Sequence, residues 1–328
     1  MHILVTGGAG FLGQLLAQKL LTHPIIGKQL QQLTLADVTA VPTAALQALK
    51  TPSSEAKVVA VKSDLTDPVA VQQLITSDIT AVYHLAAVVS GQAEANFDLG
   101  KAVNVDGTRL LLEAVRHQAP GTMVVFASSL AVFGGSLPEV ITEATALKPQ
   151  SSYGTQKAIG ELWVNDYTRK GYIDGRVLRL PTVCVRPGKP NAATSSFASS
   201  IIREPLQGKS AVCPVETSLP LWLSSPETVV ANLIHSLGLS AYQFNDSRTV
   251  NLPGITVTVQ AMIEALAKVG GPEATARIDY QLDETISRIV ASWPSRFDVR
   301  RAIALGFVGD LAFTDIIAAF MQSHPTPK

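Results

Sequence analysis

The chain has 328 residues, 47% of them hydrophobic and 16% charged, which excludes a disordered protein and allows one large domain or two. Its 26 basic residues equal its 26 acidic residues. This balance gives no electrostatic reason to expect nucleic acid or an acidic membrane surface as a partner, so we expect a small molecule.

Cysteine, histidine and the N-terminal segment narrow the class further. Cys184 and Cys213 are too few for a disulfide framework, and the six histidines show no metal-ligand spacing, so we predict reduced thiols and no metal site. The chain opens with MHILVT, which lacks a basic leader, and no apolar run reaches the length of a membrane span. We expect a cytoplasmic protein without a membrane anchor.

The first half of the chain alternates strands and helices. Short apolar runs predict strands, and segments with helical periodicity separate them. The predicted strands are 2–6, 33–37, 57–61, 81–86, 123–128 and 175–180, and the predicted helices are 11–21, 68–76, 94–118 and one that begins near 151. This alternation predicts an α/β fold, a doubly wound parallel sheet of the Rossmann type with helices on both faces.

The regular alternation ends after Pro181. We expect helices at 195–207, 226–238, 257–269 and 313–322, a segment interrupted by prolines at 211–226 and a short strand at 250–254. The predicted organisation is therefore a sheet domain over 1–183, rejoined by parts of 226–255. Residues 184–328 form mainly a smaller, irregular lobe.

A glycine-rich loop, TGGAGFLG, follows the first strand and opens the first helix. In this context Gly7 permits a tight turn, Gly10 lets the backbone approach a pyrophosphate, and Gly13 allows close packing of helix and strand. The helix N-terminus supplies N–H groups and a partial positive charge for phosphates. The loop predicts a dinucleotide site in which Phe11 and Leu12 also contact the ligand.

Two aspartates indicate the kind of dinucleotide. Asp37 ends the second strand, where a carboxylate can accept hydrogen bonds from the ribose hydroxyls and repels a 2′-phosphate. NAD is therefore favoured over NADP. Asp64 and Leu65, in KSDLTD, either approach the adenine or form an ordinary loop in which Asp67 caps the next helix.

Tyr153 and Lys157 are four residues apart on one predicted helix and therefore share a face. A nearby ammonium and the positive nicotinamide favour the tyrosine phenolate, which can accept a proton from a substrate hydroxyl. Ser128 and Ser129 lie at the carboxyl end of the fifth strand, where a serine hydroxyl can orient that substrate hydroxyl. Asn104 completes the polar set, either by holding a water or by packing between helices.

These motifs together resemble the extended short-chain dehydrogenase/reductase superfamily, the NAD-dependent epimerases and dehydratases. The resemblance rests on TGGAGFLG, Asp37, YHLAA, VNVDGT, SSLAVFG and YGTQK and covers nearly all of the first 185 residues. It implies a catalytic triad of Ser129, Tyr153 and Lys157, assisted by Asn104. It also implies a homodimer formed through the helices near 94–118 and 151–170. The residues implied to contact the cofactor are Leu85, Ala86, Ala87, Pro181 and Val183, besides Asn104, Tyr153 and Lys157.

The substrate class is narrower than the superfamily. Ser129-Leu130-Ala131 stands where a sugar-nucleotide dehydratase has Thr-Asp-Glu, so dehydration is excluded, whereas a sugar-nucleotide epimerase stays open. The segment 179–208, with VCPV and SWPSRFD, resembles the D-erythronate dehydrogenase branch. That resemblance implies NAD-dependent oxidation of the C2 hydroxyl of a four-carbon sugar acid to the 2-oxo acid. An NAD-sensing regulatory protein is the non-enzymatic alternative.

A small sugar acid needs a cation or hydroxyl groups to bind its carboxylate. The candidate substrate residues are Ser90, Ser129, Arg186, Lys189, Asn191, Ser195 and Arg203. Two further expectations concern packing. Trp163, Trp222 and Trp293 are predicted to be packing residues, and His84 is predicted to be a buried, hydrogen-bonded histidine.

Overall fold

Seven parallel strands form the central sheet in the order β10-β6-β5-β4-β1-β2-β3. The computed structural model describes residues 1–49, 55–190, 192–245 and 247–324. The strands are β1 (His2–Thr6), β2 (Gln32–Asp37), β3 (Lys57–Lys62), β4 (Ala81–His84), β5 (Met123–Ser129), β6 (Asp174–Leu180) and β10 (Thr249–Asn251). The doubly wound Rossmann sheet predicted from the sequence is confirmed.

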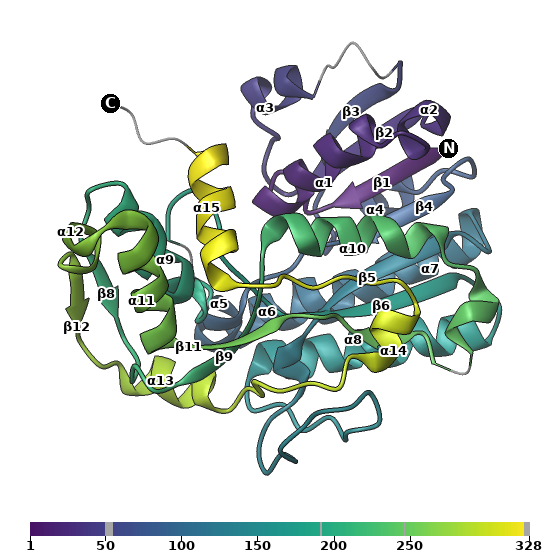
Figure 1. Ribbon diagram of the computed structural model, residues 1–328. Helices are drawn as coiled ribbons and strands as arrows, with labels where there is room; N and C mark the ends of the chain where they lie inside the picture. The colour runs from purple at the N-terminus through teal and green to yellow at the C-terminus, as the bar shows by residue number, and fades with distance from the viewer. Residues whose placement is uncertain (50–54, 191, 246, 325–328) are drawn as a thin grey trace.

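Helices cover both faces of this sheet (Figure 1). One apolar core joins α1 (Phe11–Thr22) and α10 (Pro226–Gly238) to the sheet. A second core joins α4 (Pro68–Leu74), α7 (Thr108–Gln118) and α8 (Ser152–Arg169) to the opposite face. Shorter elements of this half are α2 (Ile26–Gln29), α3 (Thr43–Ala48), α5 (Ser90–Ala95), α6 (Phe97–Gly100), the π-helix η1 (Lys101–Gly107) and the 3₁₀ turn η2 (Leu130–Val132).

A third core lies in the second half of the chain, beside the sheet (Figure 1). Its helices are α9 (Ser196–Leu206), α11 (Val259–Gly270), α12 (Pro272–Thr275), α13 (Glu284–Ala291) and α15 (Phe313–Ser323). Two small sheets accompany them: β11 (Ile255–Thr258), β9 (Pro220–Ser224) and β7 (Thr182–Val183), and β12 (Ile278–Tyr280) with β8 (Ala211–Cys213). This separate core supports our proposed division near residue 183.

Two predicted helices differ from the structure. The helix expected over 94–118 is divided into α5, α6, η1 and α7, because Asn96 leaves helical geometry and caps α6 by accepting from the Leu99 N–H at 3.0 Å. The helix expected over 257–269 begins only at Val259, since its first residues belong to β11. The strand predicted at 175–180 corresponds to β6, which ends at Leu180, and β7 then pairs with β9 in a different sheet.

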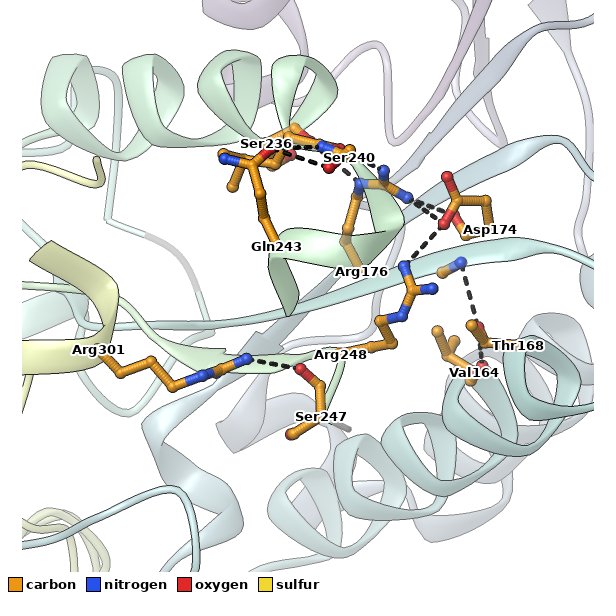
Figure 2. Close-up of polar contacts among 12 residues, drawn as sticks. Val164, Thr168, Asp174, Arg176, Ser236, Ser240, Gln243, Ser247, Arg248 and Arg301 are labelled. Carbon is orange, nitrogen blue, oxygen red and sulfur yellow. Dashed lines mark hydrogen bonds and ion pairs between the residues drawn. The ribbon is translucent and has the colours of Figure 1, made fainter. Parts of the chain in front are cut away.

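The chain returns to the central sheet through α10, the turn η3 (Ala241–Phe244) and β10. Arginines hold this return segment by donating to backbone carbonyls (Figure 2). Arg176 is 1% exposed, donates to the carbonyls of Ser236 and Leu239 at the end of α10, and pairs with Asp174 at 2.7 Å. Arg301, on α14 (Arg300–Ala304), donates to three carbonyls of 244–249. These donors satisfy carbonyls that the irregular turn leaves without a helical or strand partner.

Across the described ranges, every helix is too short or too polar to cross a membrane.

Candidate active site

A cavity of about 300 Å³ lies at the carboxyl ends of β1, β4, β5 and β6, next to the third core. This is the edge at which open α/β sheets bind ligands. The predicted cofactor residues that line it are Gly7, Gly10, Phe11, Leu12, Gly13, Leu85, Ala87, Tyr153, Lys157, Pro181 and Val183. The predicted substrate residues that line it are Ser90, Ser129, Arg186 and Ser195.

The remaining predicted residues do not line this cavity, although several lie close to it in the chain. They are Asp37, Asp64, Leu65, Ala86, Asn104, Lys189 and Arg203. Asn191 lies outside the described residues. The structure thus brings segments near 7, 85, 129, 153 and 186 together around one cavity.

The glycine loop has the backbone geometry of a phosphate cradle. Gly7 adopts a φ of +74°, which favours glycine, and an added Cβ would lie 2.8 Å from the Ala86 N. Helix α1 follows Gly10 directly, and no described side chain caps its N-terminus. The first N–H groups of α1 therefore face the cavity edge where a pyrophosphate would bind.

Asp37 lies at the end of β2, beside this loop. Its Oδ2 accepts from the Ala9 N–H at 3.0 Å, and its Oδ1 accepts from the Thr39 N–H and hydroxyl, both at 3.0 Å. Each carboxylate oxygen has further lone pairs, so the group is oriented and still able to accept from ribose hydroxyls. This arrangement fits NAD, and a 2′-phosphate would meet a negative charge.

The KSDLTD segment follows β3. Asp64 is exposed and its Oδ1 accepts from the Thr66 N–H and hydroxyl at 2.9 and 2.8 Å. Asp67 caps α4 by accepting from the Val69 N–H at 2.9 Å. Leu65 is buried in the core under α4 and α7. The cap alternative is thus correct for Asp67, and an adenine contact of Asp64 and Leu65 stays a prediction.

Ser129, Tyr153 and Lys157 meet at one end of the cavity. Ser129 ends β5, and its Oγ accepts from the Ala131 N–H at 3.2 Å. Helix α8, capped by Ser151, carries the tyrosine and the lysine on one face. Gly154 allows this approach, because an added Cβ would lie 2.1 Å from the Ala131 carbonyl oxygen.

Burial dominates the titration of Tyr153. It raises the pKa of the phenol to about 12, whereas a hydrogen bond from Ser129 and the charge of Arg186 act in the opposite direction. Lys157 Nζ lies 5.8 Å from the tyrosine ring centre and donates to the Ala127 carbonyl at 2.8 Å. A lowering of the tyrosine pKa by Lys157 together with a bound nicotinamide stays a prediction.

Lys157 is 3% exposed and lies over the Phe126 ring at 4.7 Å. Burial lowers the pKa of its ammonium to about 8, and the charge of Glu161 acts against this lowering. An ammonium with such a pKa changes charge close to physiological pH, so its neighbours decide whether it is protonated.

Asn104 lies in the π-helix η1 and is 3% exposed. Its Nδ2 donates to the Val88 carbonyl at 2.9 Å and to Gln156 Oε1 at 2.7 Å, and its Oδ1 accepts from the Val88 N–H at 2.8 Å. The amide therefore ties the segment after β4 to α8. This is the packing alternative for Asn104, and it positions the helix that carries Tyr153.

Of the three cations proposed to bind the substrate, Arg186 is the one that lines the cavity. Its Nη2 donates to Ser195 Oγ at 3.0 Å, and burial lowers the pKa of its guanidinium. No ion pair joins Arg186 to a carboxylate within the described ranges. Arg186 and Tyr153 both line the cavity, and the charge of Arg186 acts to lower the pKa of the tyrosine. A guanidinium in such a position is suited to bind an anionic ligand group.

The other two candidate cations lie elsewhere. Lys189 is exposed. Arg203, at 2% exposure, pairs with Glu204 at 2.6 Å and donates to the Arg186 carbonyl at 2.6 Å. Arg203 therefore positions the backbone of Arg186 and does not reach the cavity itself.

Trp293 lines the cavity, which sequence analysis missed. It follows α13 and also packs on the third core, so its description as only a packing residue was incomplete. The available signal was the SWPSRFD segment, whose contribution to the cavity depends on the tertiary fold.

His84 is buried, as predicted. Its two ring nitrogens form hydrogen bonds with the hydroxyls of Thr6 and Thr108 at 2.8 and 2.9 Å. Burial lowers the pKa of the imidazole to about 3.

Comparison with known proteins defines the family. The model of the NAD-dependent epimerase/dehydratase family matches residues 3–223. The chain is 50% identical, over the full length of both proteins, to a D-erythronate dehydrogenase of Cupriavidus necator. It is 49% identical to a D-erythronate dehydrogenase of Haemophilus influenzae, with 98% of this chain and 99% of that protein covered.

A solved structure described as the nucleoside-diphosphate-sugar epimerase from Agrobacterium tumefaciens is 41% identical, with a TM-score of 0.90 and coverage of 99% of this chain and 94% of that one. These matches confirm the predicted superfamily, NAD as the cofactor and an NAD-dependent dehydrogenase as the enzyme class. The chain belongs to the NAD-dependent epimerase/dehydratase family.

Proposed function

We propose that this enzyme oxidises the C2 hydroxyl of D-erythronate, or of a closely similar four-carbon sugar acid, to the 2-oxo acid with NAD. The observation that carries the proposal is Arg186, a guanidinium in the cavity wall without a carboxylate partner among the described residues. A monoanionic substrate would provide that partner. The cavity of about 300 Å³ is lined by the predicted cofactor residues as well as by the substrate candidates, so the room left beside a bound nicotinamide favours a compact acid.

The glycine loop, the start of α1 and Asp37 would hold the dinucleotide, as their geometry fits a pyrophosphate and a ribose. When bound, NAD accepts a hydride from C2 and brings a positive charge close to Tyr153. That charge favours the phenolate and opposes the effect of burial on the tyrosine. Lys157 would reach the nicotinamide ribose from α8.

The residues at the cavity end would then perform the proton transfer. Ser129 Oγ holds the C2 oxygen, and Tyr153 Oη takes the hydroxyl proton as the carbon–oxygen double bond forms. Arg186 binds the carboxylate next to C2 through parallel hydrogen bonds, with Ser195 and Ser90 beside it. One hydride leaves C2 and one proton leaves its oxygen, so the products are the 2-oxo acid, NADH and a proton.

A sugar-nucleotide epimerase is the second candidate, because the 41% identical Agrobacterium tumefaciens structure carries that description. The two reactions differ in their net redox change. Oxidation of D-erythronate produces NADH, measured at 340 nm in absorbance, whereas epimerisation of a UDP-hexose produces none. NADH formation with D-erythronate supports the dehydrogenase, and hexose interconversion without NADH would replace it. Binding of NAD with neither reaction would support the NAD-sensing alternative.

Arg186→Met tests the carboxylate contact, with Lys189→Met as the matched change of a cation in the same segment. Because Arg186 lines the cavity and Lys189 is exposed, we expect the first to raise KM for D-erythronate by about a hundredfold, as loss of a charge-assisted pair costs a few kcal/mol. The second should change KM less than about twofold. A larger effect at Lys189 than at Arg186 would contradict this assignment.

A further inference from the structure

A buried acid–base network lies directly under the proposed catalytic residues. Glu161 is one helical turn after Lys157 on α8 and is 2% exposed. Its Oε1 accepts from Ser128 Oγ at 2.5 Å and from Arg179 Nε at 2.9 Å. Its Oε2 accepts from Arg179 Nη2 at 2.7 Å. Both carboxylate oxygens are therefore occupied by strands β5 and β6.

The network extends to the edge strand. Arg179 Nη1 donates to Asn251 Oδ1 on β10 at 3.3 Å, and the guanidinium lies over the Phe133 ring at 4.7 Å. Hydrophobic residues of similar volume often replace a buried ion pair without loss of stability, so stability alone is a weak reason for this one. Its place beneath Lys157 indicates a different role.

The charged and titratable groups that face Lys157 come from four elements. Tyr153 and Glu161 share its face of α8, His84 faces it from β4, Arg179 lies on β6, and Arg186 follows β7. Burial keeps His84 neutral at physiological pH. Glu161 is thus the acid whose charge favours the ammonium form of Lys157, and it opposes the lowering by burial.

We infer that Glu161 and Arg179 are positioning residues that keep Lys157 charged and directed at the Ala127 carbonyl, an inference that rests on the proposed function of Lys157. Glu161 supplies the negative charge that compensates the ammonium of Lys157. Arg179 orients the Glu161 carboxylate and partly offsets its effect on Lys157. Ser128, next to Ser129, links the same carboxylate to the end of β5. The network therefore couples the charge of the lysine to the position of the triad.

The two partners must act on Lys157 in opposite directions, which gives a sharp test. Glu161→Gln leaves Arg179 uncompensated and should lower the midpoint of the Lys157 titration by about one pH unit or more. Arg179→Met leaves Glu161 uncompensated and should raise it by a similar amount. The double variant should return to within about half a unit of the unmodified protein. The midpoint is read by NMR on protein with ¹³C-labelled lysine Cε, with the signal assigned through Lys157→Met.

Asp174→Asn is the matched control, because it breaks a second buried-arginine pair on the same strand, β6, at the end away from the cavity (Figure 2). It should lower the melting temperature and leave the Lys157 midpoint unchanged. Arg179→Lys keeps the charge and should retain a midpoint close to that of the unmodified protein.

Shifts of equal sign, or no shift, in the two single variants would overturn the inference. If Glu161→Gln does not fold, Arg179→Met and the double variant still provide the comparison, since an unraised midpoint in Arg179→Met overturns it as well. The pH profile of kcat/KM should move with each midpoint. Because the NMR titration needs no turnover, absence of sugar-acid oxidation would remove the proposed function without affecting this result.

Discussion

Among single residues, Tyr153 has a pKa that conflicts with its proposed role as a base. Its burial raises the pKa of the phenol to about 12. The phenol therefore stays protonated at neutral pH, whereas a general base must be deprotonated. Ser129 and Arg186 act against this shift, and a positively charged nicotinamide would add to them. The tyrosine is thus suited to become a base only when the cofactor is present.

Tyr153→Phe should lower kcat by about a thousandfold or more, within the range attributed to a positioned general base. The dissociation constant of NAD should change less than about threefold, because the substitution leaves the glycine loop and Asp37 unchanged. Steady-state NADH formation measures the first quantity and fluorescence titration the second. Turnover equal to that of the unmodified protein would remove Tyr153 from the mechanism.

The three candidate cations show why side-chain roles need the tertiary fold. Arg186, Lys189 and Arg203 all follow β6 within a short stretch, and residue type alone favours none of them. In the structure one lines the cavity, one is exposed, and one supports the backbone of the first. The exposure of these side chains and the direction in which they point depend on contacts with α9. The local sequence does not encode such contacts.

At the level of elements, α8 carries Tyr153 and Lys157 of the proposed active site and also Glu161 of the buried network. Strand β6 carries an arginine near each end. Arg179 serves the cavity end, and Arg176 serves the return of the chain from α10. The predicted helix at 226–238 matches α10, because its strong apolar periodicity and the Ser225 cap are local signals. The division of 94–118 depends on contacts of Asn96 and Asn104, which periodicity does not reveal.

Arg176→Met should destabilise the protein by roughly 3 kcal/mol, as in the loss of one partner of a buried pair. The reason is that the carbonyls of Ser236 and Leu239 lose their arginine donor, while Asp174 keeps only its pair with Arg248. Urea denaturation followed by circular dichroism measures the change. An exposed pair, Arg300 with Asp298, is the matched control, and Arg300→Met should leave the free energy of unfolding nearly unchanged. Equal losses in the two variants would contradict the role of Arg176.

For the whole molecule, the order of elements makes the two proposed parts interdependent. The chain leaves the central sheet after β6, forms α9 and β9, returns as α10 and β10, and leaves again for α11. The first core takes residues from both parts, including those of α10 and β10 and Phe307, whereas the third core is built from residues after 183. The cavity lies where the parts meet, so a ligand that binds there contacts both.

NAD should therefore raise the melting temperature of both parts in one transition. At about 100 times its dissociation constant, NAD adds about 2.7 kcal/mol to the free energy of unfolding, which corresponds to several degrees. Circular dichroism and tryptophan fluorescence should give the same midpoint. NADP should produce a much smaller shift, because its 2′-phosphate meets Asp37. Two separate midpoints would contradict this interdependence, and an equal effect of NADP would contradict the role of Asp37.

By itself, the sequence determined the Rossmann fold, the NAD-binding loop and the family, since glycine positions, strand periodicity and the Tyr153–Lys157 spacing are local patterns with local physical causes. Only the tertiary structure decided that Arg186 faces the cavity, that Trp293 joins it, and that Glu161 and Arg179 lie beneath Lys157. Those facts depend on burial and on contacts between residues far apart in the chain. Burial also sets the pKa values of Tyr153 and Lys157, which no local pattern contains.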